Sequence, residues 1–80
     1  MQLDAIDSDT ILSGIGAEVK RRRSRLGLTQ IKLADEAGIH PNVIGRLERG
    51  TYNPTILVLC GIAAALGTIL TDLARRGLKQ

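Results

Sequence analysis

The densest group of charges lies in residues 20–25, which read KRRRSR and place five cations in six positions. Guanidinium and ammonium groups at this density can hold phosphate, although on a helix the same run often forms only a solvated surface. Three of the eight acids, Asp4, Asp7 and Asp9, precede this run near the start of the chain. The remaining sequence is therefore more basic than the net charge of +3 indicates.

Other reactive side chains are isolated. Cys60 is the single cysteine, so it cannot close an internal disulfide, and it has no neighbours at the spacing of metal ligands. His40 has no cluster of carboxylates and cysteines beside it, and we expect it at the start of a helix rather than in a metal site. No nucleophile and base, and no acid and base carboxylates, fall where one small fold could assemble them. We therefore expect no enzyme, no metal and no cofactor.

Helices must position these side chains. The 80 residues suffice for one small domain, and Tyr52 is the single aromatic residue, so the core must be aliphatic, which favours helices. Apolar spacing with glycine and proline positions predicts five short helices, over residues 15–26, 29–37, 41–49 and 55–66, and from Thr68 or Thr71 to Arg76.

The expected organisation is one all-α, five-helix domain between two tails. We assign residues 1–12 to a flexible acidic N-terminal tail, 13–76 to the domain and 77–80 to a C-terminal tail. The acidic start is unlike a secretory signal, and a lone cysteine suits a reducing compartment, so a cytoplasmic protein is expected.

The most informative stretch is residues 30–49, QIKLADEAGIHPNVIGRLER. Two short helices joined by three residues must cross steeply, and Ala34 is small where they would press together, while Gly38 supplies the turn. The wedge between the helices is filled by aliphatic side chains, which are Ile39, Ile44 and Leu47. One face of the second helix, with Asn42, Val43 and Arg46, then faces solvent, while the opposite face is packed rigidly against the first helix. A helix exposed in this way fits the major groove of DNA.

In this region, small residues, turn residues and apolar residues all occur at the spacing that one known motif requires. They are Gln30, Leu33, Ala34, Gly38, Ile39, Ile44, Leu47, Glu48 and Gly50, preceded by Gly27, Leu28 and Thr29 and followed by Asn53 and Pro54. Residues 15–73 thus resemble the helix-turn-helix domains of the phage repressor and Cro type, the XRE family. The resemblance implies five helices, double-stranded DNA as the ligand, and a symmetric dimer on a pseudopalindromic operator.

The resemblance also implies roles for the residues of the second helix. Asn42 and Arg46 match base-facing positions, and their side chains can pair bidentately with adenine and guanine. Pro41 and Val43 are assigned to the same surface, although proline can offer a base only apolar contact with a thymine methyl, or nothing. Gly45 departs from a good helix sequence and costs about 1 kcal/mol relative to alanine, and its small size could allow close approach of the backbone.

Phosphate contacts and one ion pair follow in the same way. Gln30 occupies a position where a side chain and a helix N-terminus meet a phosphate. The expected phosphate-contacting residues are Lys20, Arg21, Arg22, Thr29, Gln30, Thr51, Tyr52 and Asn53. Arg23 and Glu48 fall where the family commonly places a salt bridge, so we expect Arg23 to be structural.

Residues 55–70, TILVLCGIAAALGTIL, carry no charge. A bilayer span needs about 20 apolar residues, and glycine and threonine interrupt this stretch, so we expect no membrane contact. The resemblance turns most of its large side chains inward, namely Ile56, Leu59, Cys60, Ile62, Ala63, Leu66, Leu70 and, beyond the stretch, Leu73. Five apolar residues remain where the family is usually polar, and they predict a homodimer seam unless they are scattered surface residues: Leu57, Val58, Gly61, Ala64 and Ile69.

Two functions remain after these steps. The first is a sequence-specific, double-stranded DNA-binding transcriptional regulator that acts as a dimer. The alternative is an antitoxin-like or controller protein whose two last, apolar helices bind a different protein partner.

Overall fold

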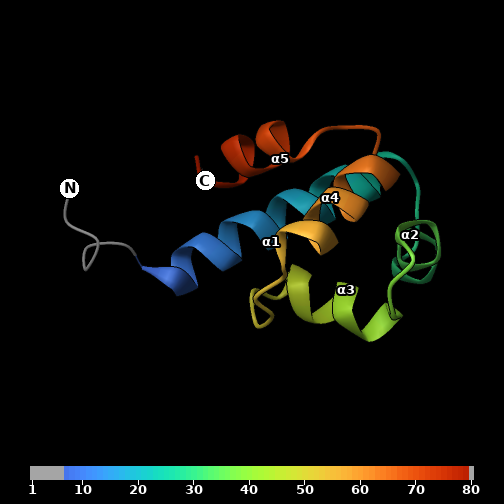
Figure 1. Ribbon diagram of the computed structural model, residues 1–80, viewed down its shortest axis with the longest axis horizontal. Coiled ribbons are helices and arrows are strands. Elements are labelled where there is room, and N and C mark those ends of the chain that lie inside the picture. Colours follow the sequence, from blue (N-terminus) through green and yellow to red (C-terminus); the bar gives the residue numbers. More distant parts are fainter. Residues whose placement is uncertain (1–6, 80) are drawn as a thin grey trace.

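The computed structural model describes residues 7–79, and these fold into five helices without a strand (Figure 1). The helices are α1 (Ser8–Arg25), α2 (Gln30–Ala37), α3 (Pro41–Glu48), α4 (Ile56–Ala65) and α5 (Leu70–Gly77). The expectation of an all-α, five-helix domain is confirmed.

Helix α1 begins earlier than the sequence predicts. Asp7 caps it, because its carboxylate accepts hydrogen bonds from the backbone N–H of Asp9 at 3.0 Å and the hydroxyl of Thr10 at 2.8 Å. The Thr10 hydroxyl is the main cause that lowers the pKa of Asp7. The predicted boundary at residue 13 is therefore wrong: the tail assigned to residues 1–12 already contains the first helical turn. Residues 1–6, with Asp4, lie outside the described part of the chain.

Three of the helix boundaries follow local rules. Thr29 accepts from the N–H of Lys32 at 3.0 Å, and Thr55 from the N–H of Val58 at 3.1 Å, as expected for N-caps. Gly38 ends α2 in the left-handed region, with φ of 72°.

The start of α5 does not follow the prediction. Its N-cap is Ile69, without a side-chain cap, so the assignment to Thr68 or Thr71 is wrong. The Thr68 hydroxyl instead donates to the carboxylate of Asp72 at 3.3 Å, and is therefore not used on the backbone. The helix also runs one residue past the expected end, to Gly77.

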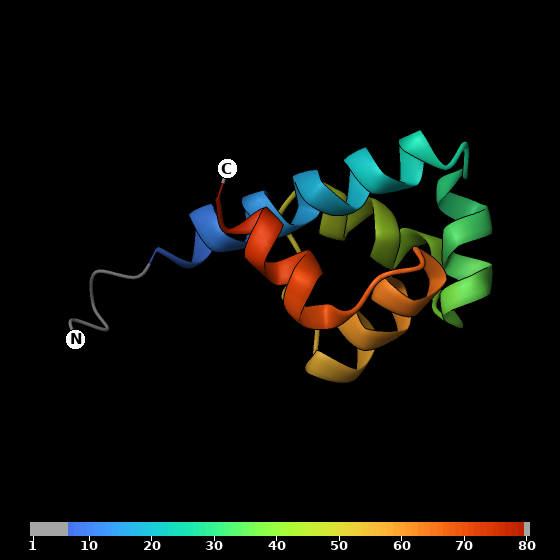
Figure 2. The ribbon, with the colours of Figure 1, turned by 90° about the horizontal axis from the view of Figure 1, so that it is seen from above.

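Helix α1 is the central element and packs against α3 on one side and α5 on the other (Figures 1 and 2). Glycines permit both contacts. A Cβ atom on Gly16 would collide with the carbonyl oxygen of Leu47 in α3, and one on Gly14 with the carbonyl oxygen of Gly77 in α5. The core between the helices is aliphatic throughout, and consists of Ile15, Val19, Leu33, Ala34, Ile44, Leu47, Ile62, Ala63, Leu66 and Leu73.

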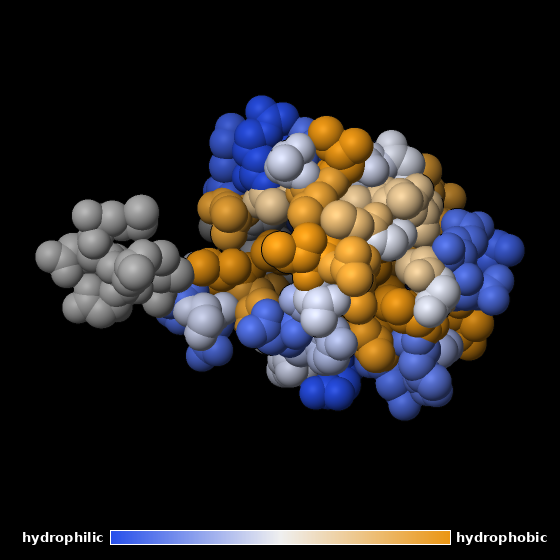
Figure 3. Space-filling model, viewed as in Figure 1, coloured by the Kyte–Doolittle hydropathy of each residue, from blue (hydrophilic) through white to orange (hydrophobic). Residues whose placement is uncertain are grey.

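Helix α4 is rotated relative to the expectation. Ile62, Ala63 and Leu66 are buried as predicted, but Ile56 is 68% exposed and Cys60 is also exposed, so those two inward assignments are wrong. The exposed residues recur at helical spacing and form one apolar face, which we call the α4 face: Ile56, Leu57, Cys60 and Ala64. Apolar surface spreads over the region of α4 in Figure 3.

Three of the five residues predicted for a dimer seam lie off the α4 face: Ile69, which precedes α5 and is exposed, and Val58 and Gly61, which pack within the chain. A Cβ atom on Gly61 would come within 3.3 Å of the carbonyl oxygen of Ala37, so Gly61 serves close packing against α2. Val58 is half-buried and packs against the core. Both are partly buried by contacts within the chain, so they are less available to a seam than Leu57, Ala64 and Ile69.

The uncharged stretch does not produce a long apolar helix. Within residues 7–79, no single helix has both the length and the apolar composition to cross a membrane. Helices α4 and α5 meet those criteria only when taken together, and they are bent by 96° relative to each other.

Candidate nucleic-acid interface

Helix α3 presents a polar face on a buried base. His40 caps it through Nδ1, which accepts from the N–H of Asn42 at 3.1 Å, and Pro41 occupies the first turn. His40 thus stands at the helix start, as expected. Ile44 is completely buried on the inner side, whereas Asn42 and Arg46 are exposed. The structure places the two predicted base readers outward, one turn apart.

A buried carboxylate fixes the C-terminal end of α3. Glu48, whose side chain is 3% exposed, accepts from Nε of Arg23 at 2.6 Å and from Nη2 at 3.0 Å. Arg23 also donates to the carbonyl oxygen of Leu28 at 2.8 Å, so the ion pair connects α1, the following loop and α3. Its hydrogen bond to Glu48 raises the pKa of the Arg23 guanidinium. This is the ion pair that the sequence analysis expected, and it orients α3 relative to α1.

Gln30 belongs to the same network. Its Nε2 donates to Oε1 of Glu48 at 3.0 Å, although the residue itself is exposed. Because the amide nitrogen is held, the side-chain oxygen of Gln30 has a defined direction. The first residue of α2 is therefore coupled to the end of α3.

The loop after α3 holds Arg46 from two sides. The backbone N–H and the hydroxyl of Thr51 both donate to the carbonyl oxygen of Arg46, at 3.0 and 3.1 Å. The guanidinium carbon of Arg46 lies 5.4 Å from the centre of the Tyr52 ring, in a cation–π contact. Tyr52 packs against the core, while Thr51 and Asn53 are exposed. The loop thus sets the direction of the Arg46 side chain.

A polar groove of about 300 Å³ brings residues of α2 and α3 together. Its lining comprises Gln30, Pro41, Asn42, Gly45, Arg46 and Arg49. Val43 is half-buried and does not line it, so it stands apart from the other three predicted base-facing residues.

Arg49 was missed by the sequence analysis. It follows Arg46 by three residues, so helical spacing already indicated a shared face. A Cβ atom on Gly45 would lie 3.3 Å from Nη1 of Arg49 and 3.6 Å from Oε1 of Gln30. The side chains of Arg49 and Gln30 therefore lie beside Gly45 in the groove.

The basic run at residues 20–25 is divided between opposite sides of α1. Successive residues of a helix point about 100° apart, so neighbours in sequence need not share a surface. Lys20 is exposed and follows Gly16 by one turn, on the side of α1 that meets α3.

Arg21 and Arg22 do not join that surface. Arg21 donates from Nε to Glu18 at 3.0 Å, and Arg22 donates to Glu18 at 2.6 Å and to Asp72 of α5 at 2.9 Å. This pairing holds both guanidinium groups on the α5 side, away from α3, and their predicted contacts with DNA phosphates stay predictions. Thr29 likewise uses its hydroxyl oxygen as the cap of α2.

No group of three or more His, Cys, Asp and Glu side chains suited to a metal ion occurs within residues 7–79. The one histidine in this part of the chain, His40, uses Nδ1 as a helix cap. What the site offers to a ligand is hydrogen-bond donors, acceptors and positive charge on α2, α3 and the loop after α3.

Comparisons with known proteins agree with this geometry. A family model described as helix-turn-helix matches residues 19–73. A control protein, C.SmaI of Serratia marcescens, is 36% identical over 67 residues, which are 82% of this chain and 80% of that protein. The immunity repressor protein of Bacillus phage phi105 is 36% identical over 53 residues, 66% of this chain but 37% of the repressor.

Solved structures show the same fold. The clp gene regulator ClgR of Corynebacterium glutamicum has a TM-score of 0.82 at 25% identity, over 86% of this chain and 73% of that one. The restriction-modification controller protein C.AhdI of Aeromonas hydrophila has a TM-score of 0.76 at 29% identity, over 78% of this chain and 94% of that one.

Proposed function

The chain belongs to the helix-turn-helix family and is a DNA-binding transcriptional regulator, and we propose that it reads a pseudopalindromic operator as a homodimer with α3 in the major groove. The observation that carries the proposal is the outward face of α3. Asn42 and Arg46 point to solvent there, while the Arg23–Glu48 ion pair fixes the helix behind them. A short helix held at a set angle with free polar tips is what base readout requires.

The readers differ in what they can recognise. Asn42 matches an adenine and Arg46 a guanine through paired hydrogen bonds. Pro41, which lines the same groove, offers only apolar contact to a thymine methyl. Val43 contributes less to readout, since it is half-buried outside the groove.

Phosphate contacts would flank these readers. Gln30, at the N-terminus of α2, and Lys20, on the α3 side of α1, are the contacts that the geometry favours most. Arg49 joins them because it is exposed beside the groove. Further contacts are assigned to the turn before α2 and the loop after α3, at Thr29, Thr51, Tyr52 and Asn53.

The test begins with duplexes selected by the protein from a random library. On the selected duplex, Arg46→Ala should lose about 1–3 kcal/mol of binding free energy and relax the preference at one base pair, as measured by fluorescence anisotropy. Lys20→Ala should weaken selected and random duplexes alike and reduce the salt dependence of binding. If Arg46→Ala loses as much on random as on selected duplex, the assignment of α3 to base readout is wrong.

The homodimer is assigned to the α4 face together with Ile69. Leu57 is 83% exposed, Ile56 68% and Ile69 67%, and apolar surface of this kind is typical of an interface between chains. Leu57→Glu should convert the dimer to a monomer in light scattering at micromolar concentration. Ile31→Glu is the matched control, because Ile31 is equally apolar and 69% exposed but lies on α2.

A second candidate function uses the same face. If light scattering finds the unaltered chain monomeric, the exposed side chains of α4 favour a different protein partner, as in an antitoxin-like or controller protein. That outcome would contradict the homodimer while leaving the DNA-binding face of α3 as assigned.

A further inference from the structure

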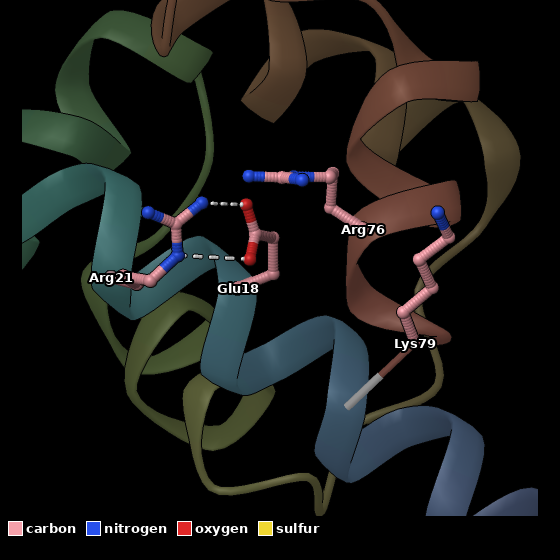
Figure 4. Close-up of a pocket in the computed structure, with 4 residues that line it drawn as sticks. All are labelled: Glu18, Arg21, Arg76 and Lys79. Atoms are coloured by element: carbon pink, nitrogen blue, oxygen red, sulfur yellow. Dashed lines mark hydrogen bonds and ion pairs between the residues drawn. The ribbon is translucent and has the colours of Figure 1, made fainter.

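A second pocket lies on the side of α1 that faces α5. It has a volume of about 230 Å³ and is lined by Glu18 and Arg21 of α1, Arg76 of α5, and Lys79, which follows α5. In Figure 4, the guanidinium group of Arg76 extends from α5 towards the carboxylate of Glu18, which holds Arg21 in place. None of these four residues belongs to the groove beside α3.

Positive charge is concentrated around this pocket. Five cations in and beside it, Arg21, Arg22, Arg75, Arg76 and Lys79, accompany two carboxylates, Glu18 and Asp72. Of the residues that line the pocket itself, three are cations and one is a carboxylate, so a net positive charge faces it.

The two carboxylates are already committed to other cations. Glu18 is 2% exposed and accepts from Arg21 and Arg22, while Asp72 accepts from Arg22 at 2.9 Å and Arg75 at 2.6 Å. Within residues 7–79, Arg76 has no such carboxylate partner, and neither does Lys79.

We propose that this pocket binds a phosphate group, held by Arg76 and Lys79 with Arg21 as the third cation. A phosphate group carries nearly two negative charges and several acceptor oxygens. These match the flexible ammonium group of Lys79 and the guanidinium groups of the two arginines, which can donate two hydrogen bonds side by side. Glu18 prepares the site, because its buried carboxylate fixes Nε of Arg21 at 3.0 Å and leaves that side chain partly exposed.

The phosphate can come from a small phosphorylated molecule or from a nucleic-acid backbone. The geometry separates this pocket from the proposed operator contact, because α3 packs against a different side of α1 from α5. A duplex in the pocket would thus be held apart from the base-reading face. The site goes beyond the proposed function and does not depend on it.

The test titrates the full chain with inorganic phosphate at constant ionic strength and follows backbone amide shifts by NMR. We expect saturable shifts at Glu18, Arg21, Arg76 and Lys79, and a dissociation constant about tenfold higher in each of Arg76→Gln and Lys79→Gln. Arg75→Gln is the matched control. Arg75 lies on the same helix, but it pairs with Asp72 and does not line the pocket, so this variant should bind phosphate with unchanged affinity.

Two further arms identify the source of the phosphate. If a short random duplex shifts the same amide signals and Arg76→Gln weakens that effect, the ligand is a nucleic-acid backbone. If only inorganic phosphate shifts them, the ligand is a small phosphorylated molecule. Arg46→Ala should leave phosphate binding unchanged, which separates failure of this site from failure of operator binding. Unsaturable shifts, or equal affinity in unaltered chain, Arg76→Gln and Lys79→Gln, would overturn the proposal.

Discussion

The two sides of α1 hold neighbouring arginines in different ways. On the α3 side, Arg23 is paired with a carboxylate that is 3% exposed, and this one pair connects two helices. On the α5 side, Arg21 and Arg22 share Glu18, and Arg22 also reaches Asp72. The α3 side has one ion pair, supported by neutral hydrogen bonds from Gln30 and to the Leu28 carbonyl, whereas the α5 side has an ionic network with more cations than carboxylates.

The difference indicates what each side contributes. A closed, buried pair fixes one geometry, which a base-reading helix needs, but it fails when either partner is lost. A network in which cations share carboxylates tolerates the loss of one member, because the remaining groups can pair again or turn to solvent. We therefore expect substitutions on the α3 side of α1 to cost more stability and more DNA binding than equivalent ones on the α5 side.

The largest contrast should come from removing each buried carboxylate. Glu48→Ala leaves Arg23 without its partner in a site where that side chain is 13% exposed, so the free energy of unfolding should fall by about 3–5 kcal/mol. Glu18→Ala should cost less, about 1–2 kcal/mol, because Arg22 keeps Asp72 and Arg21 can reach water. Urea unfolding of both variants measures the difference, and equal losses would contradict the distinction between the two sides.

The glycines of α1 offer a second comparison. Gly14→Ala and Gly16→Ala each drive a methyl group into a backbone carbonyl, of Gly77 and Leu47 respectively, and each should lower the free energy of unfolding by about 1–3 kcal/mol. Gly16→Ala should also weaken selected-duplex binding, because it displaces α3, whereas Gly14→Ala displaces α5. Fluorescence anisotropy, at a temperature where both variants are folded, measures the two losses of binding. A larger loss for Gly14→Ala than for Gly16→Ala would contradict this expectation.

Local sequence was sufficient for most of the fold. Thr29, Thr55 and Gly38 act within one turn of their own position, so their caps were predictable without knowledge of the tertiary structure. Thr68 was misassigned because its hydroxyl is used by Asp72, whose position depends on Arg22 of a distant helix. Contacts across the fold decide such cases, and no local pattern contains them.

The orientation of α4 was not predictable from periodicity. The helix reads ILVLCGIAAA and has no polar residue, so apolar spacing cannot indicate which side faces the core. The family resemblance placed Ile62 and Ala63 correctly and Ile56 and Cys60 wrongly.

The candidate site divides in the same way. The outward direction of Asn42 and Arg46 was predictable because the apolar residues between and beside them face the core, while their role as base readers stays a prediction. The ion pairs of Arg21 and Arg22 were not predictable, because a run of cations has no periodicity and gives no sign of which helix face pairs with α5. Their assignment required the positions of Glu18 and Asp72 in space.

A smaller effect should follow from the ring beneath Arg46. Tyr52→Leu removes the cation–π contact, which is worth about 0.5–1 kcal/mol at an exposed site, so discrimination between selected and random duplex should fall a few fold. Tyr52→Phe keeps the ring and should retain discrimination, and thereby separates orientation of Arg46 from a phosphate contact by the phenol. If Tyr52→Phe is as impaired as Tyr52→Leu, the hydroxyl is the important group and the orienting role is wrong.

The smallest effect should be a pH dependence on the α5 side. Hydrogen bonds from Arg75 and Arg22 lower the pKa of Asp72 from 3.8 to about 2. A carboxyl group whose pKa is lower in the folded chain stabilises the fold above its unfolded pKa, and this stabilisation disappears as the pH falls from 3.8 towards 2. The urea midpoint of Asp72→Asn should therefore decline less between pH 4 and pH 2 than that of the unaltered chain.

The control for this comparison is Asp35→Asn, which removes an exposed carboxylate of α2 that has no ion pair within residues 7–79. It should follow the unaltered chain through the same pH range. The effect of Asp72→Asn should remain small, because Arg22 keeps Glu18 when Asp72 is neutral, as a shared network allows. A steep, cooperative loss of structure caused by protonation of Asp72 alone would mean that the α5 side depends on one closed pair, as the α3 side does.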